Sequence, residues 1–169
     1  MILKKLWILF LLLFMLAGCG AKETFETVDD QMAEPVSAPM GQLSMTLPDS
    51  ASLSVMDNGA GDRLYLCDGY TIAVQTMPAG DLEKTLYETT GFSKDSLKLI
   101  QTNHYGADRY DLVWSAAGEG GDQVCRATIL DDGTYHYVVT MMAPAETAGE
   151  FTESWQSTLN SLSINHQTG

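Results

Sequence analysis

Residues 63–77 read Arg-Leu-Tyr-Leu-Cys-Asp-Gly-Tyr-Thr-Ile-Ala-Val-Gln-Thr-Met. Two runs of alternating apolar and polar residues flank Asp68-Gly69, and such a pair is a strong signal for a two-residue β-hairpin turn because glycine tolerates the positive φ that the turn needs. The turn sets the register of the hairpin and gives it one apolar face, which we expect to lie in the core. On that face Tyr65 opposes Ile72 and Cys67 opposes Tyr70, and Val74 extends it.

Further strands are predicted on both sides of this hairpin by the same period of two. A second turn at Asp131-Asp132-Gly133 predicts a second hairpin of the same kind. The expected strands cover residues 43–47, 52–56, 97–101, 109–116, 123–130 and 134–142, and 163–164 form a last extended piece.

Two helices are predicted by apolar residues at helical spacing. The first covers residues 81–88, has acidic residues at its start and ends near Gly91. The second carries one apolar stripe, and Thr147 with Glu150 matches a capping box before it. The stripe consists of Phe151, Trp155, Leu159 and Leu162. We expect it to pack on the sheet, although a partner-binding helix would show the same pattern.

This order of elements predicts an α+β fold. Consecutive hairpins make an antiparallel β-sheet, here of about six or seven strands, and two α-helices should cover one face or one end of it. The expected globular domain covers residues 42–165 of the 169 in the chain, and residues 166–169 form a tail. One domain is what this length predicts.

The first 19 residues have the order of an export signal. Lys4-Lys5 precede an uninterrupted apolar run over residues 6–16, which is shorter than the roughly 17–25 residues of a membrane span. The ending Leu16-Ala17-Gly18-Cys19 resembles the lipobox of bacterial lipoproteins. That resemblance implies cleavage before Cys19 and attachment of acyl chains such as palmitate to it. The alternatives are an ordinary signal peptide with a chance cysteine, or a membrane anchor.

The lipobox resemblance divides the N-terminal part of the chain and places the protein. Residues 1–18 become a signal peptide, and 19–41 hold the lipidated Cys19 and an acidic tether. Five acids and two prolines within residues 20–41 make this segment a solvated spacer. The lipid bilayer is then a partner through acylated Cys19, and the expected location is the extracytoplasmic side of a bacterial membrane.

The charge balance excludes a nucleic-acid partner. The chain has nine basic and 22 acidic residues and a net charge of −13. Removal of residues 1–18 makes it −15 on 151 residues. A nucleic-acid binder needs a basic patch, and there is no basic cluster beyond Lys4-Lys5.

Four stretches of the expected domain resemble PsbP-like domains, including bacterial DcrB-type lipoproteins. They are Leu43 to Pro48, Tyr105 to Asp111, Gly133 to Thr140 and the ending from Phe151 to Leu162. The resemblance covers residues 42–165 and implies a PsbP-like α/β sandwich. It also implies a mostly non-enzymatic role in assembly or as an accessory subunit. It carries over no functional residue.

Residues with catalytic or ligating chemistry are few. No nucleophile elbow, phosphate loop or dinucleotide fingerprint is present, so no catalytic residue and no cofactor are expected. None of the three histidines has a second ligand at zinc spacing. A metal site from His136, Asp131 and Asp132 is a weak candidate, and a solvated hairpin explains the same residues. Cys67 and Cys125 could pair in an exported protein or remain free thiols.

Three functions are compatible with these patterns. The first is a membrane-anchored, non-catalytic accessory or assembly protein that binds an envelope protein. The second is a module that binds a small ligand or a cation at the cell envelope. The third is an enzyme such as a hydrolase. A deep polar pocket with converging His and Asp side chains would favour the second or third function, and an exposed apolar patch over several hundred Å² would favour the first.

Overall fold

A computed structural model of the chain describes residues 40–56, 62–118 and 120–166. The chain separates into two units, Met1–Pro35 and Val36–Gly169, and all described residues belong to the second. The predicted signal peptide, Cys19 and most of the tether therefore lie outside the described residues. No helix in the described ranges is long and apolar enough to cross a membrane.

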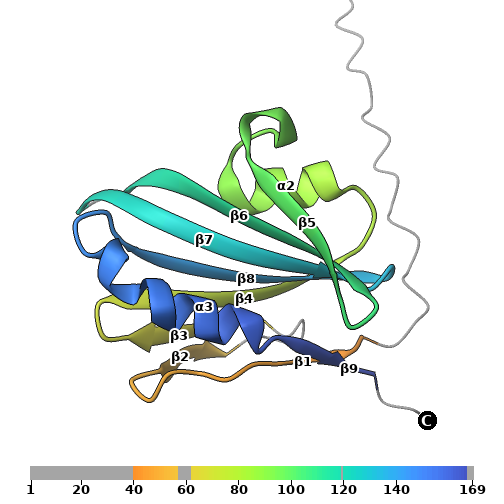
Figure 1. Ribbon diagram of the computed structural model, residues 1–169, viewed down its shortest axis with the longest axis horizontal. Helices are drawn as coiled ribbons and strands as arrows, with labels where there is room; N and C mark the ends of the chain where they lie inside the picture. Colours follow the sequence, from red (N-terminus) through yellow and green to blue (C-terminus); the bar gives the residue numbers. More distant parts are fainter. Residues whose placement is uncertain (1–39, 57–61, 119, 167–169) are drawn as a thin grey trace, which may run out of the picture. The chain divides into compact units, whose positions relative to one another are not determined.

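The described unit is built on a seven-stranded antiparallel sheet with the strand order β2-β3-β4-β8-β7-β6-β5 (Figure 1). Its strands are β2 (Ser52–Met56), β3 (Arg63–Cys67), β4 (Tyr70–Pro78), β5 (Leu99–His104), β6 (Ala107–Gly118), β7 (Gly121–Asp131) and β8 (Tyr135–Pro144). A second sheet pairs β1 (Gln42–Ser44) with β9 (Ser163–Asn165). The helices are α2 (Leu82–Thr90) and α3 (Thr152–Asn160), and 3₁₀ turns lie at Lys94–Ser96 and Ala148–Phe151. The predicted α+β fold is confirmed.

The hairpin that decides the fold has the predicted register. Asp68-Gly69 joins β3 to β4, and Gly69 has a φ of 82°. Tyr65 opposes Ile72 and Cys67 opposes Tyr70. A Cβ atom at Gly69 would also lie 2.7 Å from the ring of Phe151. This position therefore needs a left-handed backbone and has no room for a side chain.

The two helices pack on opposite faces of the sheet, so the prediction that they share one face or end is wrong (Figure 1). On the α3 face, Trp155 and Leu159 join a core that contains Ile72 and Met141. On the α2 face, Leu86 joins a separate core. That second core also contains Leu112, Trp114, Cys125, Ala127, Ile129 and Val138. The reason lies in the central strands, because β8 is buried at every position from His136 to Met141 and needs cover on both faces.

The start of the last helix also differs from the prediction. Thr147 makes no capping bond, and its hydroxyl donates to the Pro144 carbonyl instead. A 3₁₀ turn follows, so α3 begins only at Thr152. The apolar stripe is confirmed, because its four residues lie in or against the core of the α3 face.

The strand predicted at residues 97–101 is shifted along the chain. Lys94–Ser96 form a 3₁₀ turn, so β5 begins at Leu99. It continues to His104 because the following turn consists of only Tyr105 and Gly106, both with positive φ.

Candidate functional site

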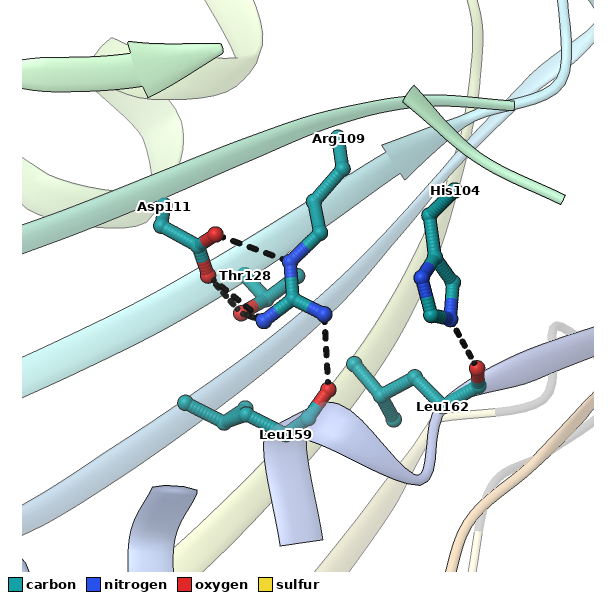
Figure 2. Close-up of polar contacts among 6 residues, drawn as sticks. All are labelled: His104, Arg109, Asp111, Thr128, Leu159 and Leu162. Atoms are coloured by element: carbon teal, nitrogen blue, oxygen red, sulfur yellow. Dashed lines mark hydrogen bonds and ion pairs between the residues drawn. The ribbon is translucent and has the colours of Figure 1, made fainter. Parts of the chain in front are cut away.

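Side chains from β5 and β6 hold the C-terminal end of α3 on the sheet (Figure 2). The Arg109 guanidinium donates from Nη1 to the Leu159 carbonyl at 3.1 Å. The His104 ring donates from Nε2 to the Leu162 carbonyl at 2.8 Å. The last carbonyls of a helix lack partners within the helix and carry its negative dipole end, so the Arg109 cation fits at Leu159, while Leu162 lies just past the end of α3.

Arg109 is itself held by the partly buried carboxylate of Asp111. Its Nε donates to Asp111 Oδ2 at 2.8 Å and its Nη2 to Asp111 Oδ1 at 2.9 Å (Figure 2). Thr128 adds a hydroxyl bond to the same carboxylate at 2.6 Å. This two-bond pairing satisfies both charges and fixes the plane of the guanidinium. Arg109 and Asp111 lie two residues apart on the polar face of β6, which is the sequence signal for the pair that our predictions did not use.

A pocket of about 410 Å³ opens at the end of the sheet where α3 meets β9. The β5–β6 turn, the β7–β8 turn and the C-terminal strand all contribute to its wall. The lining residues are His104, Tyr105, Gly106, Ala107, Leu130, Asp132, Ser163, Ile164, Asn165 and His166. This volume lies within the roughly 300–1,000 Å³ of small-molecule sites, and the lining mixes apolar and polar groups as such sites do.

Asp132 is the carboxylate of this pocket. Groups of its own β7–β8 hairpin already donate hydrogen bonds to both of its oxygens. Oδ1 accepts the backbone N–H groups of Thr134 and Tyr135. Oδ2 accepts the Tyr137 hydroxyl at 3.1 Å and lies 3.6 Å from Nε2 of His166. Burial raises the pKa of Tyr137 to about 12, and the nearby Asp132 adds to this effect. Tyr137 therefore stays protonated and donates at every physiological pH.

The three weak metal candidates do not converge on one point, because Asp132 lies apart from His136 and Asp131. His136 faces α2, where its Nε2 lies 3.4 Å from Asp131. Asp132 faces the pocket with Tyr137 instead, because neighbouring residues at the turn point to opposite faces. Within the described ranges, no group of three His, Cys, Asp or Glu side chains is placed to hold a metal ion.

His136 takes part in an arrangement that resembles a catalytic relay. The Thr85 hydroxyl lies 2.7 Å from His136 Nδ1, and Asp131 contacts the other ring nitrogen. A hydroxyl, an imidazole and a carboxylate in this order are the parts of a nucleophilic triad. Here Thr85 is only 4% exposed and His136 only 1%, so a substrate cannot reach the hydroxyl. The relay instead ties α2 to β8 and to the β7–β8 turn.

A Thr85→Val variant is expected to lower the free energy of unfolding by about 1–3 kcal/mol, because it leaves a buried imidazole nitrogen without a partner. Urea denaturation measures this. Thr89→Val in the same helix is the control, since the Thr89 hydroxyl is buried without a hydrogen bond and its removal should be neutral or stabilising. Equal losses for both variants would contradict a structural role for the relay.

Of the two alternatives for Cys67 and Cys125, the structure has free thiols at both positions. Cys67 packs against the core of the α3 face and Cys125 lies in the core of the α2 face, with β4 and β8 between their strands. A disulfide needs Cα atoms within about 7 Å, which opposite faces of separate strands do not allow. Burial raises the pKa of both thiols, which makes them poor nucleophiles.

Comparisons with known proteins concern the fold. The sequence matches no protein-family model, and the comparison with curated proteins found no match. Among solved structures, the cyanobacterial PsbP (CyanoP) of Synechocystis superposes with a TM-score of 0.50 at 9% identity, over 76% of this chain and 95% of its own. The described domain has the PsbP-like fold.

Two further structures share this fold. LpqN of Mycobacterium tuberculosis, described as involved in cell envelope biogenesis, has a TM-score of 0.52 at 12% identity and covers 77% of this chain and 87% of its own. A Bacteroides thetaiotaomicron protein has a TM-score of 0.54 at 13% identity, over 75% of this chain. This chain spans about half of that protein, 46% of its length.

Proposed function

We propose that the domain is a non-catalytic binding module that serves as an accessory or assembly protein in the bacterial cell envelope. Its acylated Cys19 holds it on the extracytoplasmic side of a membrane, and residues 20–41 are the tether. The lipobox sequence and the PsbP-like fold, which LpqN of the mycobacterial envelope shares, support this proposal.

The observation that carries the proposal is an uncovered part of the α3 face. Helix α3 packs against β4 and β8. On the same face of the sheet, β5 and β6 carry two aliphatic side chains that are exposed to solvent. Ile100 is 65% exposed and Val113 is 57% exposed. They lie diagonally across the β5–β6 pair, since Ile100 opposes Asp111 and Val113 comes two residues later. We call these two residues the β5–β6 patch.

The surroundings of the β5–β6 patch indicate what it would bind. β5 is an edge strand, so its outer backbone groups can pair with an added strand. Lys98 directly precedes β5, and Arg126 opposes Val113 on β7. These cations flank the patch on a chain that is otherwise acidic. An extended segment of a protein partner with aliphatic and acidic residues fits this surface.

Photo-cross-linking in cells tests this proposal. A photoreactive phenylalanine analogue in place of Val113 is expected to give a discrete adduct with one envelope protein. The same analogue in place of Tyr87, which is exposed on α2 on the other face, is the control and should give none. Adding Ile100→Glu to the Val113 probe should remove the adduct. An adduct that forms equally from both positions, or no adduct, would overturn the protein-binding function.

The pocket favours a second candidate function, the binding of a small ligand. His104, Asp132 and His166 converge on one cavity there, which is the arrangement that distinguishes a ligand-binding module from a purely protein-binding one. The two functions use different parts of the β5–β6 hairpin and are compatible in one molecule.

A further inference from the structure

The charges of the residues that line the pocket limit which ligands it can bind. Neither Lys nor Arg lies among the lining residues, and the one carboxylate, Asp132, is already bonded by the hairpin and Tyr137. The chain as a whole carries a charge of −13. An anionic ligand would be repelled by this field and would find no Lys or Arg to pair with, and His166 already lies beside Asp132. The wall suits a neutral polar ligand.

The polar groups that remain available form a mixed set of neutral donors and acceptors. His104 uses Nε2 on Leu162, which leaves Nδ1 as an acceptor. Asn165 donates one amide hydrogen to Ser44 and keeps its carbonyl oxygen and its second hydrogen. Ser163 contributes a hydroxyl to the wall. Ile164 supplies apolar surface beside them, while Ala107 is only 7% exposed and Leu130 is fully buried. A ligand rich in hydroxyl groups, with an apolar face, matches this set.

Tyr105 places an aromatic ring at the mouth of this pocket. It is 90% exposed, and its ring meets that of His104 edge-on with a centroid distance of 4.5 Å. Its φ of 52° is left-handed, a region where tyrosine is uncommon and where Asn before glycine is the usual choice in such a turn. A tyrosine in a conformation that is costly for it, at an exposed turn, points to a function for the ring.

We propose that the pocket binds a sugar ring of an uncharged glycan, with Tyr105 stacked on the apolar face of the ring. A sugar presents hydroxyls that each donate and accept, together with C–H surfaces that pack on an aromatic side chain. Histidine, asparagine and serine then hold the hydroxyls. This inference rests on the second candidate function and names its ligand class, and it does not need the β5–β6 patch.

The experiment uses amide NMR spectra of the full chain in a zwitterionic detergent without a sugar headgroup. Methyl β-glucoside is expected to shift the amides of Tyr105, Gly106 and residues 163–166. Methyl β-glucuronide, the same ring with a carboxylate, should bind at least tenfold more weakly. Tyr105→Asn keeps a residue suited to the left-handed backbone and removes the ring, so it should weaken glucoside binding about tenfold.

Tyr87→Asn removes another exposed tyrosine, on α2 and 63% exposed, and should leave glucoside binding unchanged. Unchanged amide shifts away from the turn show that each variant is folded. The sugar proposal is overturned if the glucoside shifts no pocket amide, if the glucuronide binds as tightly, or if Tyr105→Asn has no effect. It is also overturned if trialanine shifts these amides more strongly than the glucoside, which would make the ligand a peptide. None of these results changes the cross-linking at Val113, so failure of one proposal can be told from failure of the other.

Discussion

An Asp111→Ala variant is expected to lose about 3–5 kcal/mol of its free energy of unfolding, because it leaves the buried charge of Arg109 without its partner. The loss should extend to α3, since the same guanidinium holds the Leu159 carbonyl. Chemical denaturation measures the free energy. Hydrogen exchange of the α3 backbone amides shows whether the helix loosens before the sheet does.

Two further variants test whether the loss is specific to the Arg109–Asp111 pair or would follow from breaking any ion pair. Glu88→Ala breaks the exposed pair of Lys84 and Glu88, whose atoms are 3.9 Å apart, and should cost only a few tenths of a kcal/mol. The double variant Arg109→Met with Asp111→Leu removes both charges of the pair, the buried Arg109 and the partly buried Asp111, and should recover much of the loss. A cost below about 1 kcal/mol for Asp111→Ala would mean that packing, and not this ion pair, holds α3.

Local sequence patterns predicted the parts of the fold that local chemistry determines. The turn at Asp68-Gly69 set the register of the β3–β4 hairpin, because a two-residue turn leaves no freedom in the pairing. The stripe from Phe151 to Leu162 predicted the buried face of the last helix. Its start was predicted less well, because Thr147 found a competing acceptor in the Pro144 carbonyl.

Contacts between segments that are distant in the sequence could not be predicted from local patterns. The assignment of helices to faces depends on β8, whose unbroken burial from His136 to Met141 shows that both of its faces are covered. The hydrogen bond from Arg109 to the Leu159 carbonyl joins residues that are 50 positions apart in the sequence. The pocket needs two turns and the end of the chain in one place, and no local pattern brings His104 to His166.

A Cys19→Ser variant is expected to lose its acyl chains completely and to leave the membrane fraction. In the lipobox interpretation this thiol is the attachment point, and serine cannot form the thioether that lipidation of such a cysteine requires. Stable anchoring takes two signals, so one chain or none would not hold the domain. Metabolic labelling with palmitate and membrane fractionation measure both effects.

Cys67→Ser and Cys125→Ser are the matched controls, because these free thiols belong to the domain and should not affect labelling. The distribution of Cys19→Ser also separates the alternatives for residues 1–18. Loss of the label with release from the membrane supports a lipoprotein. A wild-type chain that carries no label and does not sediment with membranes would be an ordinary secreted protein. A wild-type chain that carries no label and stays in the membrane with residues 1–18 attached would show that the apolar run itself is the anchor, and the lipid-anchor proposal would then fail.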